Sequence, residues 1–118
     1  NDISKNVDPG TVVISKANCG VPEFVDGNIM YSGTQELMSQ YVQIAMNSGA
    51  KIIGGCCGTS FDHVRAMRKA MDQHSVSPPP TLQEIEEKVG VMSEGSKSIF
   101  QGDDSKPTKQ RRSRRLRV

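Results

Sequence analysis

Two adjacent thiols between glycines are the feature of this 118-residue chain that most suggests chemistry. Cys56 and Cys57 lie in the segment GGCCGT at residues 54–59, directly after the apolar pair Ile52 and Ile53. Neighbouring side chains on a regular strand point to opposite faces, so both thiols can face one point only if the backbone leaves the strand conformation, which flanking glycines permit. Thiolates are the sulfur form that binds zinc. The segment therefore predicts a Zn²⁺ site with Cys56 and Cys57 as two of its ligands.

Two thiolates leave a tetrahedral zinc ion two ligands short, and catalytic zinc keeps three protein ligands and one exchangeable position. Cys19 is the one other cysteine of the sequence and is a candidate third ligand. His63 follows Cys57 by six residues, but it falls in the first turn of a predicted helix, and we do not expect it to bind metal. The competing interpretation is that the cysteines are small buried apolar residues, because free cysteine is among the most buried residue types.

The elements that must position the thiols alternate between strand and helix. The β-branched run at residues 11–15 predicts a buried parallel strand, and residues 51–54 predict a second. Thr34 is a candidate N-cap for an amphipathic helix that ends at Gly49, and Thr59 with an acidic residue three positions later resembles a capping box for another. This order with short connections predicts an α/β fold with helices packed on a parallel sheet.

Polar side chains follow both predicted strands. In parallel α/β folds, ligands gather at the carboxyl ends of the strands, so the loop with Asn18 and Cys19 should lie beside the loop with Cys56 and Cys57. The amide of Asn18 could bind the amino or carboxylate group of a substrate, or it could stabilise its own turn. Tyr31 and Glu23, in the segment between the first strand and the first helix, are predicted to be structural or exposed.

The apolar residues are concentrated before residue 72, so residues 1–75 are predicted to be the folded βαβα part. Residues 76–118 are predicted to be a Pro-rich linker, a short helix at 81–89 opened by a capping box, and a disordered Arg-rich tail from residue 93. The formal charge of +2 hides an asymmetry, since residues 1–104 carry 8 basic and 13 acidic side chains and residues 105–118 carry 7 basic and none acidic.

The basic tail could contact phosphates, but no aromatic residue is interleaved with it. Charge runs of this kind are usually solvated, so we do not expect nucleic acid as a partner. No apolar stretch approaches the length of a membrane span or a signal sequence, and an odd number of cysteines suits a reducing compartment, so we expect a cytoplasmic protein without a membrane partner. The chain begins with Asn1, and we expect it to be a piece of a longer protein.

Three motifs in order carry a family resemblance. They are KANCGVPEF at residues 16–24, YSGTQELM at 31–38 and IIGGCCGT at 52–59. Residues 12–71 resemble the C-terminal part of the homocysteine S-methyltransferase family, most closely the bacterial betaine-homocysteine methyltransferase-like proteins. The resemblance implies that the chain forms about two βα units, the last quarter of a zinc-containing (βα)₈ TIM barrel. It also implies that Cys56 and Cys57 bind zinc, that the third ligand is a cysteine upstream of this chain, and that Asn18 faces the site.

The resemblance further implies an enzyme that transfers a methyl group from an onium donor to the thiol of homocysteine, giving methionine. Betaine is favoured as the donor only through the likeness at residues 16–24. An incomplete barrel should be inactive by itself. The alternative is a small zinc-structural or nucleic-acid-binding module that uses the Arg-rich tail. A structural zinc site needs four protein ligands, and this sequence offers only three cysteines and two poorly placed histidines, a shortage that favours the enzyme.

Overall fold

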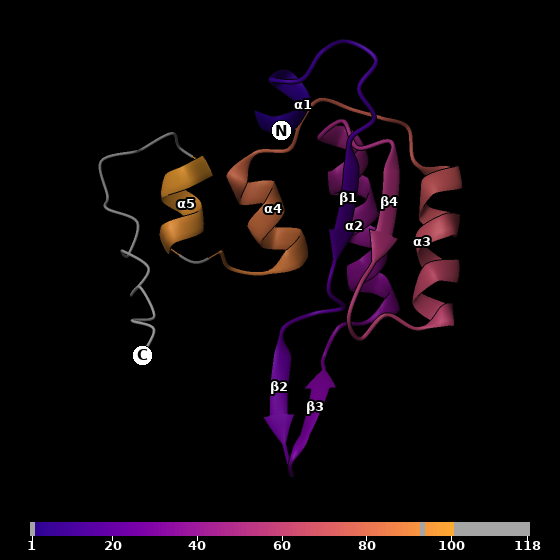
Figure 1. Cartoon of the computed structure of the whole chain (residues 1–118), viewed down its shortest axis with the longest axis vertical. Helices are drawn as coiled ribbons and strands as arrows, with labels where there is room; N and C mark the ends of the chain where they lie inside the picture. Colours follow the sequence, from indigo (N-terminus) through magenta and orange to yellow (C-terminus); the bar gives the residue numbers. More distant parts are fainter. Residues whose placement is uncertain (1, 93, 101–118) are drawn as a thin grey trace, which may run out of the picture.

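A computed structural model describes residues 2–92 and 94–100 of the chain, and Figure 1 shows its elements in sequence colours. In chain order these are α1 (Asp2–Lys5), β1 (Ile14–Ala17), β2 (Pro22–Val25), β3 (Asn28–Tyr31), α2 (Gln35–Asn47), β4 (Ile52–Gly55), α3 (Phe61–Gln73), α4 (Leu82–Val89) and α5 (Glu94–Phe100). The fold is α/β with a small parallel sheet, as predicted.

Strands β1 and β4 form the parallel sheet, with Ile14 opposite Ile52 and Ala17 opposite Gly55. The first strand was predicted at residues 11–15, and it begins and ends later than that. The reason lies in its partner, because the pairing with β4 begins only at Ile14 opposite Ile52. Just before it, the carbonyl of Val13 accepts hydrogen bonds from the amides of Lys51 and Ile52 at 2.9 and 3.3 Å.

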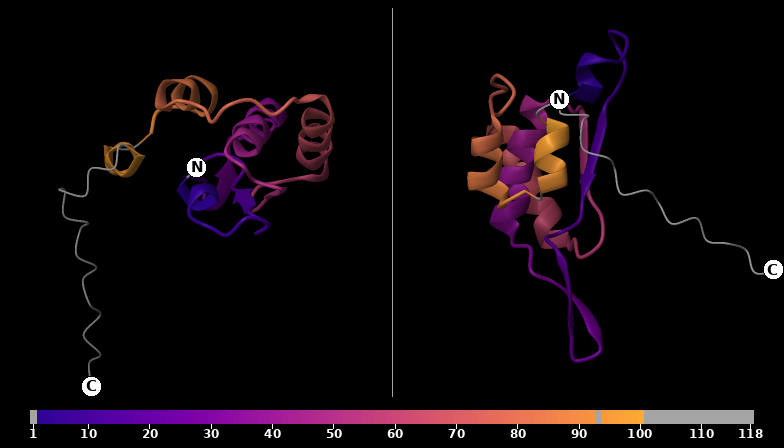
Figure 2. Two further views of the ribbon diagram at one scale, coloured as in Figure 1. Left: turned by 90° about the horizontal axis from the view of Figure 1, so that it is seen from above. Right: turned by 90° about the vertical axis from the view of Figure 1, so that its left-hand side faces the viewer.

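Helices α2 and α3 lie on one side of this sheet, and α4 continues the row beyond α2 (Figures 1 and 2). Thr34 caps α2 as predicted, since its hydroxyl accepts a hydrogen bond from the amide of Leu37 at 3.1 Å. Met38, Val42 and Ala45 are buried at helical spacing and form the inner stripe of α2. The core beneath the helices contains the buried side chains of Cys19, Met38, Val42 and Met67.

We call the other face of the sheet the bare face, because no described helix packs on it (Figure 2). On β1 the hydroxyl of Ser15 lies 2.6 Å from that of Tyr41 on α2, so Ser15 points toward the helices. Because strand side chains alternate between faces, Ile14 and its partner Ile52 point away from them. They are 60% and 53% exposed, so the prediction of a fully buried strand is wrong for this chain. Among residues 2–92 and 94–100, helices therefore cover one face of the sheet and leave the other open.

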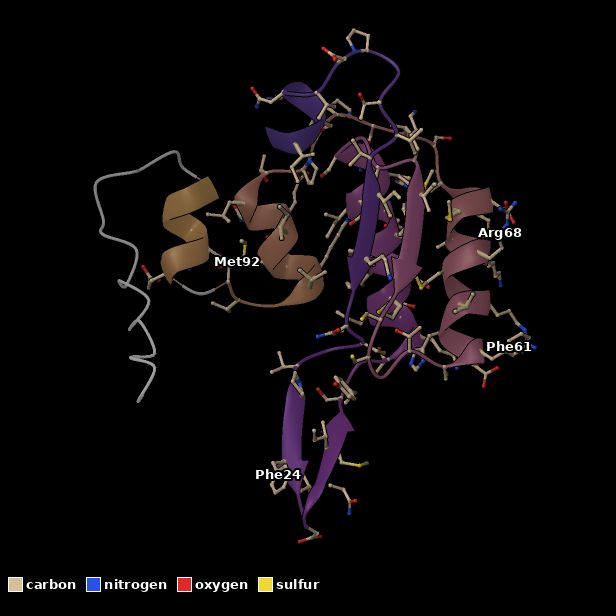
Figure 3. All side chains as sticks on the ribbon, viewed as in Figure 1. Phe24, Phe61, Arg68 and Met92 are labelled. Carbon is tan, nitrogen blue, oxygen red and sulfur yellow. The ribbon has the colours of Figure 1, made fainter. Side chains whose placement is uncertain are left out.

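Strands β2 and β3 form an antiparallel hairpin that projects from the body of the molecule (Figure 1). The sequence interpretation placed only an irregular polar segment here. Asp26 and Gly27 both have positive φ, 49° and 80°, as the two central residues of a type I′ turn require. Phe24, labelled in Figure 3, is 77% exposed on this hairpin.

Helix α4 confirms the prediction at residues 81–89, and its capping box is formed: the amide of Thr81 donates to the carboxylate of Glu84 at 2.7 Å. Helix α5 lies in a segment that was predicted to be disordered, and that prediction is wrong for residues 94–100. The ammonium of Lys97 is 3.0 Å from the carboxylate of Glu86, an ion pair that joins α5 to α4. Composition does not reveal such a pairing.

The Arg-rich run at residues 111–115 lies outside the described residues, so its predicted disorder stays a prediction. Within the part of the chain that the structure describes, no helix has the length and apolar character needed to cross a membrane.

Candidate metal-binding site

The loops that follow β1 and β4 lie side by side, which confirms the predicted juxtaposition. The amide of Cys56 donates to the carbonyl of Ala17 at 2.8 Å, and the amide of Cys19 donates to the carbonyl of Cys57 at 2.9 Å. The two strand ends are therefore linked in both directions. Each loop is held by the backbone of the other, so the position of the thiol pair is fixed by the parallel sheet.

The thiols of Cys56 and Cys57 are exposed, and their sulfur atoms are 3.8 Å apart. Gly58 follows them with φ +75°, and the amide of Thr59 closes the turn on the carbonyl of Cys56 at 3.2 Å. In a tetrahedral zinc site, two sulfurs each about 2.3 Å from the metal lie about 3.8 Å apart. The pair thus already has the separation that two zinc ligands need, and its donor atoms fit that ion.

Other ligands would have to come from elsewhere. Among residues 2–92 and 94–100, no three or more His, Cys, Asp or Glu side chains gather into a group that could hold a metal ion. The assignment of Cys56 and Cys57 as ligands therefore remains a prediction, supported by the geometry of the pair.

Cys19 differs from this pair although its backbone touches theirs. Its side chain is fully buried among Met38, Val42 and Met67, and burial raises the pKa of its thiol. The backbone of Gly33 presses closely on it, because a Cβ at that position would lie 2.6 Å from the Cys19 sulfur. The structure places Cys19 in the core, which agrees with a small buried residue and does not group it with the other two thiols.

Tyr31, at the end of β3, contacts the thiol loop. A Cβ on Gly58 would collide with Cβ, Cγ and Cδ2 of Tyr31, so the base of this side chain packs closely against the glycine. A hydrogen bond with Cys57 raises the pKa of the Tyr31 hydroxyl, and burial and the charges of Cys57 and Cys56 act in the same direction. The sequence predicts Tyr31 to be structural or exposed and does not anticipate its contact with the thiol loop.

A signal for that contact was present in the sequence. The dipeptide Asp26-Gly27 follows the apolar residues 24–25 and precedes Asn28 and the apolar residues 29–30, which predicts a hairpin. The resulting register pairs Tyr31 with Pro22 at the base of the hairpin. Glu23 pairs with Met30 and is exposed, as predicted.

Asn18 is exposed and lies one residue beyond the last pair of the sheet, next to the thiol loop. Its backbone carbonyl accepts a hydrogen bond from Gly20 at 2.9 Å, but its side-chain amide has no hydrogen-bond partner within the described ranges. The interpretation of Asn18 as a residue that stabilises its own turn through its side chain thus finds no support. Its role in substrate binding stays a prediction.

Both ring nitrogens of His63 form hydrogen bonds with backbone groups. The amide of Ser60 donates to its Nδ1 at 3.0 Å, and its Nε2 lies 3.3 Å from the carbonyl of Gly33. Since Nδ1 accepts, the proton is on Nε2 and bonds the carbonyl. Both ring nitrogens are used to fix the start of α3.

The predicted capping box with Thr59 and Asp62 is shifted by one residue, because Ser60 is the N-cap and His63 the third helical residue. The hydroxyl of Thr59 is instead buried, without a hydrogen-bond partner in the described residues, and its side chain packs on Gly55. The side chain of Thr59 thus packs against the residue that precedes the two thiols.

A comparison with known protein families gives one further finding. The family model described as homocysteine S-methyltransferase matches residues 2–71. The match covers both strands of the parallel sheet, the hairpin and the whole thiol loop.

Proposed function

The chain belongs to the homocysteine S-methyltransferase family, and on that premise we propose that it forms part of a zinc enzyme that methylates the sulfur of homocysteine. The observation that carries the proposal is the thiol pair, with sulfurs 3.8 Å apart at the carboxyl end of a parallel strand. That is the edge at which α/β enzymes place their reacting groups.

Cys56 and Cys57 would hold the ion. Bound zinc supplies one piece of chemistry, the conversion of a thiol ligand into a nucleophilic thiolate at neutral pH. The side chains around the pair then position the substrate: Asn18 offers a free amide for the amino or carboxylate group, and Tyr31 holds the thiol loop from the hairpin side. Methyl transfer from an onium donor such as betaine is a direct displacement, so alignment and exclusion of water are the main tasks, and no acid–base pair is needed.

We further propose that β1–α2 and β4–α3 are the last two βα units of a (βα)₈ barrel. The support is physical: both outer edges of the two-stranded sheet carry unpaired backbone groups in the described chain, and one face of the sheet is bare. Upstream units would cover both and would supply the third ligand, a cysteine after an earlier strand. Residues 1–118 alone should therefore show no turnover of homocysteine.

The test uses the full-length protein loaded with zinc, with homocysteine and betaine or S-methylmethionine as substrates and methionine as the measured product. Cys56→Ser and Cys57→Ser should each abolish methionine formation, because each removes a thiolate that sets both metal affinity and sulfur reactivity. Cys19→Ala is the matched control and should keep most of the activity. Full activity in both Ser variants would refute the proposal.

A further inference from the structure

Lys16 is a cation on the bare face of the sheet. In β1 it follows Ser15, which points to the helices, and it pairs with Gly54 in β4, which follows the core-packed Ile53. By the alternation of strand side chains, Lys16 and Gly54 belong to the face that no helix covers. Two residues further along the same strands come Asn18 and Cys56.

Gly54 leaves room for the stem of this lysine. A Cβ placed on Gly54 would lie 3.7 Å from Cγ of Lys16, in ordinary van der Waals contact. The Lys16 stem therefore extends over the backbone of the neighbouring strand, the one that continues into the thiol loop.

Lys16 has no ion pair or hydrogen bond to any described residue, and the amide of Asn18 on the same strand end is equally free. When the rest of a barrel encloses this face, an unpaired ammonium would be costly. It needs an anion, and Lys and a primary amide together are suited to a carboxylate.

We propose that Lys16 binds the α-carboxylate of the amino-acid substrate whose sulfur is held at Cys56 and Cys57. This assignment rests on the function proposed above. It makes Lys16 the residue by which the site selects an amino acid over a simple thiol, because the carboxylate is the group that distinguishes the two. The competing partner is a carboxylate of the protein itself from an upstream strand.

The experiment compares two ligands on the zinc-loaded full-length protein by calorimetry: homocysteine, and 3-aminopropane-1-thiol, which is homocysteine without its carboxylate. Lys16→Met should weaken homocysteine binding by about 10- to 100-fold, the range for losing one hydrogen bond to a charged group, and should leave the aminothiol within about twofold. Lys16→Arg should recover part of the homocysteine affinity.

Lys51→Met is the matched control, since Lys51 directly precedes the same sheet at its opposite end, and both affinities should stay unchanged. If Lys16→Met does not fold, Lys16→Gln removes the same charge with a polar side chain. Equal weakening of both ligands, or of neither, would overturn the assignment and indicate a protein carboxylate as the partner. Failure of the unmodified protein to bind homocysteine would instead refute the proposed function, and this assignment with it.

Discussion

The two faces of the β1–β4 sheet differ in completeness. The helix side is closed, with Met38 and Val42 at 1% and 0% exposure, whereas Ile14, Lys16 and Ile52 are exposed on the other side. The same two strands thus contribute to a buried core on one face and expose apolar side chains on the other. The difference teaches that the described residues build a core on the helix side of the sheet but leave its other face, and the thiol pair at its carboxyl end, open.

The largest effect should come from the closed face. Met38→Ala should lower the free energy of unfolding of the 118-residue chain by about 2–5 kcal/mol, because it removes a fully buried side chain and leaves a cavity. Ile52→Ala on the open face should cost less than about 1 kcal/mol, since half of that side chain is already in water. Urea denaturation of both variants measures the difference, and equal losses would contradict the contrast between the faces.

The variants Met38→Ala and Ile52→Ala can also be compared in the full-length protein. If upstream strands cover the open face, the cost of Ile52→Ala should rise there into the range of about 2–5 kcal/mol expected for a core residue. A cost that stays as small as in the short chain would mean that the face remains exposed.

A second, smaller effect concerns the hairpin and the thiol loop. Gly58→Ala should destabilise the chain by about 1–3 kcal/mol, because φ is +75° and the new Cβ would collide with the ring of Tyr31. Gly27→Ala is the control, since its φ is +80° and a Cβ there meets nothing within 4 Å. The excess cost at Gly58 in thermal or urea unfolding measures the contact with Tyr31. No excess would place the ring elsewhere.

Part of this fold and of the thiol site could be predicted from the sequence. The order of elements, the capping of α2 by Thr34 and the meeting of the two strand ends were predictable, because propensities and the geometry of parallel sheets are local rules. The bare face was not, because the run from Thr11 to Ser15 looks the same whether or not its partner strands are present. The Asp26-Gly27 turn indicates the hairpin and its register, but the contact of Tyr31 with Gly58 also depends on how the hairpin packs on the thiol loop. The pairing of Lys97 with Glu86 likewise depends on tertiary contact.

Cys19→Ala should cost about 1 kcal/mol, since it removes only one buried sulfur from a packed site. The side chain of Cys19 is part of the core on the helix side of the sheet, so its loss should affect folding stability and not metal binding. Thermal unfolding of the zinc-loaded full-length protein should show this loss at unchanged metal content, and a much larger loss that is restored by added zinc would assign Cys19 to the metal site.

The smallest effect should come from His63→Ala, which removes the side chain that accepts the amide of Ser60 at the start of α3. Loss of such a cap costs about 0.5–2 kcal/mol in known cases, and this exposed one should lie at the low end. Circular dichroism during thermal unfolding checks it. Zinc content should not change, because both ring nitrogens already serve the backbone.

The central claim is that Cys56 and Cys57 bind zinc while Cys19 does not. Its most direct test is metal analysis of the purified full-length protein and of the Cys56→Ser, Cys57→Ser and Cys19→Ala variants. We predict about one zinc per chain in the unmodified protein and in Cys19→Ala, and loss of zinc in the other two. Full zinc retention in both Cys56→Ser and Cys57→Ser would contradict the claim.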